Sequence, residues 1–471
     1  MNGKEYRNMK KDFRDLKIAY IGGGSRGWAR TLMTDLAKDD EICGTVYMYD
    51  IDYKAAQDNA IVGNKLSARE DIVGKWTYKA VETIEEALVG ADFVMLSIQP
   101  ATLDEMESDV HLPEEYGIYQ SVGDTIGPGG LVRALRTIPI YEQFAKDVEK
   151  YCPEAWVINF TNPMTVCVRT LYKVFPKIKA FGCCHEVFGT QKLFASILEE
   201  KYGINVDRED IKFNVLGVNH FTWVDEARYK GEDLFPLLAE AIEKHPQGLN
   251  NADSNWANKS WRNNYLVLAD LFKRYGIVAA AGDRHLAEFC PGNWYLKDPQ
   301  TVYDWGFDLT TIQKRRAIAE AREGITQRLV SGEDKFTLKD TGEESVRQIK
   351  ALLGLGEFIT NVNLPNVGQM DNMPLGAVVE TNAYFSGGSI RPIYAGALPG
   401  DVQALVSRVC YNQETVVEAA LKGDYEMAFK AFVNDANVDL PLDKARELYD
   451  RMLYNTKDYL PAYEKYMSSR K

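Results

Sequence analysis

The stretch Lys17-Ile-Ala-Tyr-Ile21-Gly22-Gly-Gly-Ser-Arg-Gly27 decides the fold that we predict for this chain. It begins with a short apolar run, typical of a buried strand, and the residues that follow it, 28–37, have the pattern of a helix. The glycines between them fit G-x-G-x-x-G. In this motif the first glycine allows a tight turn, the second lets a pyrophosphate approach the backbone, and the third brings helix and strand together. A glycine cluster in this strand–turn–helix setting predicts a dinucleotide site.

A carboxylate from the next strand supports this prediction. The segment Gly44-Thr-Val-Tyr-Met-Tyr-Asp50 reads as a strand, and Asp50 stands where an acidic residue binds a ribose in such folds. Asp52 is an alternative for the same role. An acid in this place favours NAD over NADP. The residues expected to bind NAD are Gly22, Gly23, Gly24, Ser25, Gly27, Asp50 and Gln99.

Strands and helices continue to alternate after this unit. We expect helices over 82–89 and 131–151, and strands over 91–98, 155–160 and 179–182. Alternation of this kind is typical of a parallel sheet with helices on its faces. The predicted fold class is therefore α/β, a Rossmann-like doubly wound parallel sheet resembling lactate and malate dehydrogenases, followed by a C-terminal α+β domain. The chain has 471 residues, too many for one ordinary core, so we expect an NAD-binding domain over 15–195 and a catalytic and oligomerisation domain over 196–471.

The glycine motif does not recur in the second half, which is therefore no repeat of the first. Residues 212–224 read as one strand with Asn219 and His220 at its centre. The tetrapeptide Thr341-Gly-Glu-Glu344 fits a capping box at the start of a helix. The other predicted elements are a mostly helical stretch over 235–275, helices over 310–329 and 345–353, a sheet region over 358–374 and structural helices over 402–463.

Composition limits the location and the partners. The chain has 55 basic and 68 acidic residues, a net charge of −13, which argues against a nucleic-acid surface. Its 7 cysteines show no framework spacing, as expected of reduced thiols. The first residues lack an apolar core, and no apolar run approaches the length of a membrane span. We expect a cytoplasmic protein without a nucleic-acid or membrane partner.

Polar residues follow several predicted strands, where ligands bind on parallel sheets. They include Gln99, the NFTNP stretch at 159–163 and the pair Cys184-His185. In the glycine-rich loop 122–130, Asp124 is either a turn residue or a residue that reaches the nicotinamide. A soft thiolate with an imidazole suits a transition metal, so Cys184 and His220 can share a divalent ion that keeps open positions for substrate. Hydrogen-bonded core histidines are the alternative.

Five motifs taken in chain order resemble one enzyme family. They are Ile21-Gly-Gly-Gly-Ser25, Asn159-Phe-Thr-Asn-Pro-Met164, Cys184-His185, Val218-Asn-His-Phe-Thr-Trp223 and Gly282-Asp-Arg-His285. Together they are similar to the NAD- and manganese-dependent glycosidases of glycoside hydrolase family four, which work without the usual pair of carboxylates. The resemblance implies that Cys184 and His220 hold Mn²⁺ or another divalent metal. It also implies that Asn162 binds substrate and that His185 protonates the leaving oxygen.

The same resemblance suggests the substrate. Glu186-Val187 after the Cys-His pair is similar to the α-galacturonidase version of the motif and differs from the versions of α-glucosidases, α-galactosidases and α-glucuronidases. The implied activity is an exo-acting α-galacturonidase that acts on a small α-linked uronide. Asp283, or a tyrosine from a nearby segment, is the implied base for the carbon-2 proton. The substrate carboxylate needs a cation, for which the candidates are Arg133, Arg284 and Arg391, with Arg391 ranked first.

Other activities stay open at this point. An α-glucuronidase, an α-galactosidase or an α-glucosidase of the same family is one alternative. Another is an ordinary NAD-dependent 2-hydroxy acid dehydrogenase with His185 or His220 as its acid and base. A protein that senses NAD without catalysis is a third. Members of the family assemble as dimers and tetramers, so the resemblance implies a homodimer or a homotetramer.

Overall fold

The computed structural model describes residues 13, 15–249 and 261–468. A nine-stranded sheet runs through it in the order β13-β12-β11-β6-β5-β4-β1-β2-β3. The strands from β6 to β3 in this order are parallel, which confirms the predicted sheet. Their bounds are β1 (Leu16–Ile21), β2 (Gly44–Tyr49), β3 (Trp76–Val81), β4 (Phe93–Leu96), β5 (Trp156–Asn159) and β6 (Lys179–Gly182).

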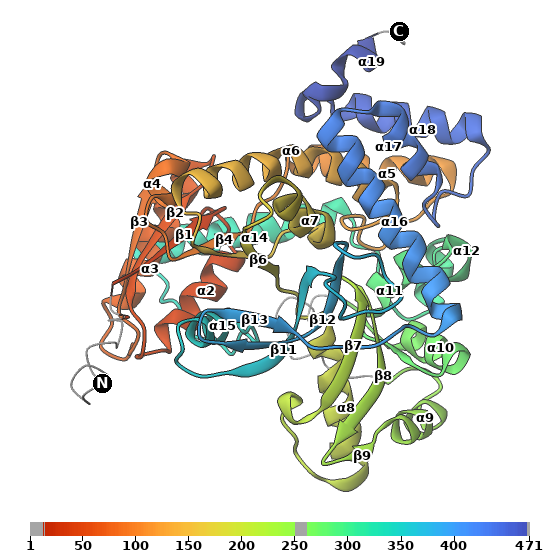
Figure 1. Ribbon diagram of the computed structural model, residues 1–471, viewed down its shortest axis with the longest axis horizontal. Coiled ribbons are helices and arrows are strands. Elements are labelled where there is room, and N and C mark those ends of the chain that lie inside the picture. The colour runs from red at the N-terminus through yellow and green to blue at the C-terminus, as the bar shows by residue number, and fades with distance from the viewer. Residues whose placement is uncertain (1–12, 14, 250–260, 469–471) are drawn as a thin grey trace.

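Helices cover both faces of this sheet, as the doubly wound fold requires (Figure 1). One core joins β1, β4 and β5 to α4 (Ile84–Leu88), α6 (Gly127–Tyr151) and α7 (Met164–Val174). The core on the other face includes α2 (Trp28–Ala37), α3 (Tyr53–Ser67) and α15 (Ser345–Leu352). The strands are buried on both faces, so they read as continuous apolar runs.

The second half of the chain extends the same sheet. Beyond β6 come β11 (Phe358–Pro365), β12 (Val378–Ser386) and β13 (Ser389–Pro392), which run antiparallel. Asn363 of β11 pairs with Gly182 at the end of β6. The two halves thus share one sheet next to the Cys184-His185 segment, and the division near residue 195 stays a prediction.

One predicted strand is a hairpin. The prediction of a single strand over 212–224 was wrong, because β7 (Lys212–Val218) and β8 (Phe221–Tyr229) pair antiparallel, with Val218 opposite Phe221. Asn219 and His220 form the turn between them, and His220 adopts a φ of 62°. Apolar residues on both sides hid this turn from the pattern. With β9 (Glu232–Asp233) and β10 (Val278–Ala279) these strands make a second sheet.

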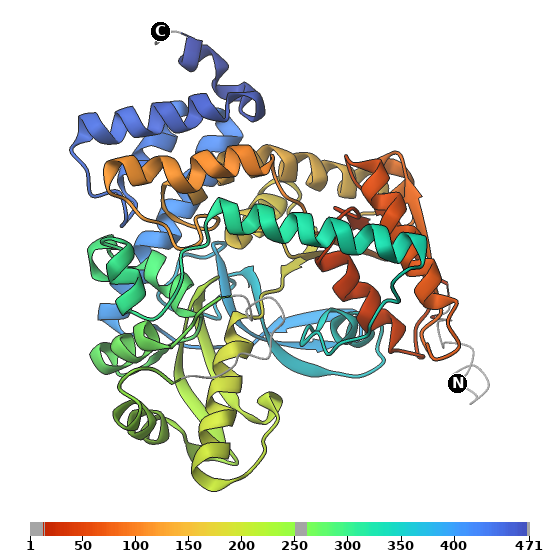
Figure 2. The same cartoon turned by 180° about the vertical axis from the view of Figure 1, so that it is seen from behind.

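Helices α8 (Glu186–Tyr202), α9 (Phe235–Lys244) and α10 (Leu266–Tyr275) share a hydrophobic core with β7 and β8 of the second sheet (Figure 1). The long helix α14 (Ile312–Ser331) runs along the back of the molecule beside α3 (Figure 2). No helix in the described part of the chain is long and apolar enough to cross a membrane. Part of the predicted helical stretch, 250–260, lies outside the described residues. The remaining α-helices are α5 (Leu103–His111), α11 (Asp283–Phe289), α12 (Gly292–Tyr295), α13 (Pro299–Asp304), α16 (Gly400–Lys422), α17 (Tyr425–Val433), α18 (Leu442–Asn455) and α19 (Glu464–Ser468).

The capping box predicted before α15 was also wrong. The residue at the N-cap is Glu344, and no side chain caps the helix there. Thr341 instead donates its hydroxyl to Asp35 of α2, at 2.7 Å from Oδ1. The Glu344 carboxylate accepts from Arg208. Tertiary partners therefore use both side chains that the local pattern assigned to the cap.

Candidate functional site

The glycine loop after β1 is a cradle that side chains would fill. Gly22 has a φ of 94°, and a Cβ added there would lie 1.9 Å from the carbonyl oxygen of Ser97. A Cβ on Gly24 would lie 2.9 Å from Asp50 Oδ2. Ser25 and Gly27 complete the turn, with Ser25 Oγ accepting from the backbone N–H of Trp28 at 3.2 Å. The first turn of α2 contains no acidic residue, so this helix end is open to an anion.

Asp50, rather than Asp52, belongs to this loop. Its Oδ2 accepts from the N–H of Gly24 at 2.8 Å. The carboxylate of Asp52 caps α3 by accepting from Ala55 N–H. Asn59 is a residue that sequence reasoning missed: it is fully buried, and its amide donates to the carbonyls of Gly23 and Ser25 at 2.8 and 3.0 Å. The glycine cradle and the adjacent carboxylate fit a dinucleotide with a free ribose hydroxyl.

Gln99 and Asn162 come together through Arg133. Gln99 lies in the loop after β4 and accepts from Arg133 Nη2 at 3.3 Å. Arg133 Nε donates to the carbonyl of Asn162 at 3.0 Å. Arg133 Nη1 and Asn162 Oδ1 are buried and have no hydrogen-bond partner among the described residues. Buried polar atoms normally have a partner, so these two atoms are available to bind a polar group from outside the protein.

A group of charged and polar side chains, which we call the polar cluster, consists of Asp124, Glu186, His220, Arg284 and His285. Glu186 begins α8, and its Oε2 accepts from Gly282 N–H at 2.8 Å. Its Oε1 lies 3.6 Å from His285 Nε2. The rings of His220 and His285 are 4.1 Å apart between centroids. The cluster therefore joins the loop before α6, the start of α8, the β7–β8 turn and α11.

The cluster holds its carboxylates ionised. Burial opposes ionisation of Asp124, but Arg315 and Arg133 lower the pKa of its carboxyl to about 2. Burial likewise opposes ionisation of Glu186, and the surrounding histidines with Gly282 N–H lower its pKa to about 2. Burial lowers the pKa of His285 to about 3. Arg315 on α14 was missed because its helix pattern gave no sign of the contact.

Cys184 and His220 offer donors that fit a transition metal. Burial, with Glu380 and Glu186 nearby, raises the pKa of the Cys184 thiol well above its usual value. His220 Nδ1 lies 3.2 Å from the Thr125 hydroxyl, which leaves Nε2 for a ligand. Within residues 13, 15–249 and 261–468, no three His, Cys, Asp or Glu residues gather as a complete metal site. Two protein donors would leave positions for substrate oxygens.

His185 does not continue the strand that precedes it. β6 ends at Gly182, and His185 has φ −97° and ψ 2° at the N-cap of α8. Successive side chains alternate only in an extended strand, so Cys184 and His185 can serve one substrate. The His185 ring lies 5.9 Å from that of Trp28, which follows the glycine loop directly. This contact connects the two parts of the site.

The two candidates for the base, the carboxylate of Asp283 and Tyr265, both lie at the start of α10. The buried carboxylate of Asp283 accepts from Leu268 N–H at 3.1 Å, at the start of α10, and burial raises its pKa to about 7. Tyr265, the N-cap of α10, is buried and adopts a φ of 57°, unusual for a bulky residue. A catalytic role of Asp283 stays a prediction.

The three candidate arginines lie in different places. Arg284 Nη1 donates to Thr310 Oγ1 at 3.1 Å, and Glu186 and Asp124 are close enough to act on its pKa. Arg133 touches Asn162. Arg391 is exposed on the edge strand β13, where its Nε donates to Ser389 at 3.4 Å. The small residues before Arg391 belong to a surface hairpin turn, so the position of Arg391 does not support ranking it first.

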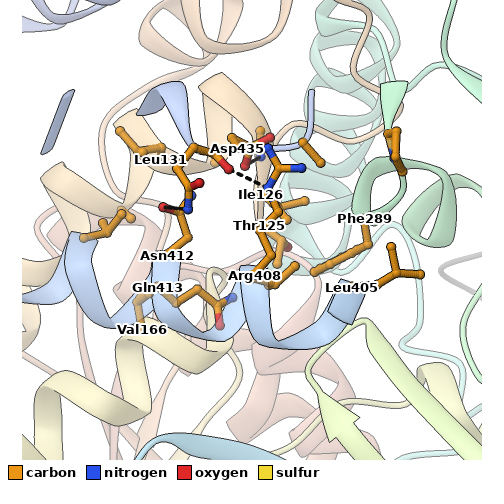
Figure 3. A pocket seen from close by; sticks show the side chains of 18 of the residues that line it. Thr125, Ile126, Leu131, Val166, Phe289, Leu405, Arg408, Asn412, Gln413 and Asp435 are labelled. Atoms are coloured by element: carbon orange, nitrogen blue, oxygen red, sulfur yellow. Dashed lines mark hydrogen bonds between the residues drawn. The ribbon is translucent and has the colours of Figure 1, made fainter. Parts of the chain in front are cut away.

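A cavity of about 150 Å³ adjoins the polar cluster between α6 and α16 (Figure 3). Leu131, Val166 and Phe289 make much of its wall apolar. Thr125 lies in the wall and also contacts His220. The cavity is therefore next to the loop that carries Asp124.

Comparison with known proteins identifies the family. Residues 17–200 match family 4 glycosyl hydrolases, and residues 215–438 match the family 4 glycosyl hydrolase C-terminal domain. An alpha-galacturonidase of Thermoanaerobacterium saccharolyticum is 60% identical over 453 residues, 96% of this chain and 97% of that protein. The alpha-galacturonidase of Bacillus subtilis is 50% identical and covers 93% of this chain and 97% of its own length.

Solved structures agree with the fold. The crystal structure of lplD from Bacillus subtilis has a TM-score of 0.88 at 50% identity and covers 93% of this chain and 100% of its own. A 6-phospho-alpha-glucosidase from gut microorganisms, solved with NAD and Mn²⁺, has a TM-score of 0.79 at 18% identity and covers 95% of this chain and 99% of its own. With both family domains matched along its length, this chain belongs to family 4 of the glycosyl hydrolases.

Proposed function

We propose that this glycosyl hydrolase is an exo-acting α-galacturonidase that uses NAD and a divalent metal, Mn²⁺ in the first place. The observation that carries the proposal is the buried Glu186 behind the Cys184-His185 pair, in a chain 60% identical to an alpha-galacturonidase. Glu186 touches neighbouring parts of the cluster through Gly282 and His285. Because Glu186 contacts Gly282 and His285, it would influence the choice of substrate by fixing the positions of these residues.

The glycine cradle and the thiol–imidazole pair are the proposed binding sites for the two cofactors. Gly22 to Gly27 would hold the pyrophosphate, and Asp50 the ribose, while Cys184 and His220 would hold the metal. Bound NAD supplies reversible hydride transfer at carbon 3 of the sugar, and the metal supplies polarisation of the neighbouring oxygens. Thr125 would keep the His220 ring in the orientation that presents Nε2.

Side chains of the site would remove and donate the protons of the reaction. Asp283 or Tyr265 would remove the carbon-2 proton of the oxidised sugar, and the pKa of about 7 suits Asp283 to a base. The bond between carbon 1 and the glycosidic oxygen then breaks, the oxygen keeps the electron pair, and His185 gives it a proton. Water later adds at carbon 1 and carbon 2 regains a proton. Because the hydride transfer at carbon 3 would be reversed within each turnover, no net NADH would form.

The substrate carboxylate would lie against a buried arginine. Arg284 and Arg133 are both close enough to Asp124 for its negative charge to favour their ionised forms, against the effect of burial on their pKa. Arg133 also carries a buried Nη1 without a partner among the described residues, beside the proposed substrate ligand Asn162. Both fit this role better than the exposed Arg391. We further propose a homodimer or homotetramer in the cytoplasm, with domains over 15–195 and 196–471.

The test is release of galacturonate from an α-linked digalacturonide. We expect turnover with NAD, Mn²⁺ and a thiol, no net NADH, loss of activity on chelation, and exchange of the carbon-2 hydrogen with solvent deuterium. Parallel assays use an α-glucuronide, a neutral α-galactoside and an α-glucoside. Cleavage of one of these without cleavage of any galacturonide would reject the substrate assignment. Stoichiometric NADH would reject the mechanism and indicate a dehydrogenase.

A further inference from the structure

A carboxylate from the second half of the chain faces His185. Glu343 Oε1 lies 3.1 Å from His185 Nδ1. Both side chains are well covered, at 7% exposed for Glu343 and 13% for His185. Glu343 lies in the tetrapeptide before α15 that the sequence pattern assigned to a helix cap.

The neighbours of Glu343 hold it in place on both sides. Its backbone N–H donates to the Thr341 hydroxyl at 3.2 Å, and Thr341 is bound to Asp35 of α2. Glu344, the next residue, accepts from Arg208 Nη2 at 2.7 Å. Because these contacts fix the tetrapeptide to two other elements, the position of the Glu343 carboxylate is set by the fold.

The contact determines which nitrogen of His185 is available. An ionised carboxylate can only accept a hydrogen bond, so Nδ1 must carry a hydrogen when it binds Glu343. The other nitrogen, Nε2, lies on the side of the polar cluster, 3.9 Å from Glu186 Oε1. A histidine held at one nitrogen by a carboxylate presents the other in a fixed direction.

We propose that Glu343 is a positioning residue that fixes the tautomer and the ring orientation of His185. The inference rests on the proposed role of His185 as proton donor. When the bond between carbon 1 and the glycosidic oxygen breaks, the oxygen keeps the electron pair and takes the proton from Nε2. Nδ1 keeps its hydrogen, which stays hydrogen-bonded to Glu343 throughout. The ring therefore does not turn between the donation of the Nε2 proton and the reprotonation of Nε2.

The test compares Glu343→Ala, Glu343→Gln and the matched control Glu344→Ala on two substrates. Digalacturonide has a poor leaving group that needs the proton, whereas 4-nitrophenyl α-galacturonide does not. We expect Glu343→Ala to lower kcat/KM for digalacturonide roughly 100-fold and for the aryl substrate only a few-fold. Glu343→Gln should recover most of the loss, because its amide oxygen can accept the same N–H. Glu344→Ala should change kcat/KM by the same factor for both substrates.

A measurement without turnover separates this inference from the proposed function. Nitrogen NMR of ¹⁵N-histidine enzyme, assigned with His185→Asn, should show hydrogen on Nδ1 in wild type and a mixture of tautomers in Glu343→Ala. An unchanged tautomer would overturn the inference, as would equal losses on both substrates or a Glu343→Gln variant as poor as Glu343→Ala. Failure of the wild-type enzyme on both galacturonides, with the expected NMR result, would instead reject the proposed activity.

Discussion

The glycine loop and the polar cluster are built in opposite ways. The loop, 22–27, is one continuous segment of backbone, which two side chains from outside it, Asp50 and Asn59, hold through its N–H and carbonyl groups. The cluster presents side chains from well separated segments, with Glu186 bridging Gly282 and His285. A site made of backbone is sensitive to added volume, whereas a site made of side chains is sensitive to the loss of particular groups.

The loop and the cluster also differ in how their surroundings shift the pKa of a buried carboxyl group. Burial raises the pKa of Asp50 above its usual value, although hydrogen bonds from the backbone N–H groups of Asp52 and Gly24 oppose this shift. The pKa of Glu186 in the cluster lies at about 2 because histidines and a backbone N–H surround it. Burial thus dominates at the carboxylate of the loop, whereas in the cluster neighbouring groups outweigh burial at both carboxylates.

The largest expected effect separates catalysis from NAD binding. Cys184→Ser should lower galacturonate release about 1000-fold, because a serine hydroxyl is a poor ligand for a transition metal whose effect is worth several kcal/mol. NAD affinity, measured by calorimetry, should stay unchanged. Cys183→Ser is the matched control, since that thiol donates to Gln348 at 3.0 Å. If both variants keep wild-type turnover, the thiol pair has no part in the metal site.

A smaller effect is expected at the loop. Asp50→Ala should weaken NAD binding about 10- to 100-fold through loss of a charged hydrogen-bond acceptor, and should relax the preference against NADP. Asp52→Ala is the control, since it removes the cap of α3 at a cost of about 1 kcal/mol and should leave NAD affinity alone. Titration with both nucleotides measures the difference. A loss of NAD affinity confined to Asp52→Ala would reverse the assignment.

Counted per pH unit, the smallest effect concerns the contribution of Asp283 to stability. Folding raises the pKa of this carboxyl to about 7, so the folded protein holds the proton more tightly than the unfolded chain. The resulting stability is complete below about pH 4 and is lost as pH rises toward about 7, with a slope of at most about 1.4 kcal/mol per pH unit.

Asp283→Asn should remove this component from the slope. Part of the slope will remain, because burial also raises the pKa of Glu288 to about 8 and that of Asp35 to about 7. Urea unfolding at a series of pH values between about 4 and 7 measures this slope. An unchanged slope would show that Asp283 does not titrate there, while a loss of carbon-2 exchange in a stable variant would support its role as base.

Local patterns predicted the parts that depend on neighbours in the chain. The glycine motif, Asp50 and the alternating strands and helices were readable because turn chemistry and side-chain periodicity act over a few residues. The Cys184-His185 pair was visible for the same reason. The hairpin turn at His220 and the false cap at Thr341 show the limit of such patterns, since one pattern fits more than one tertiary setting.

The sequence by itself determined the doubly wound fold, the dinucleotide loop and, through its motifs, the enzyme family. Tertiary structure alone decided that β11 to β13 extend the sheet, that Asp124 and Arg284 join the polar cluster, and that Glu343 reaches His185. It also decided that Arg391 is exposed on the edge strand β13. The physical reason is distance along the chain. Contacts between remote segments form only when the whole core closes, and no local spacing records which side chains then meet.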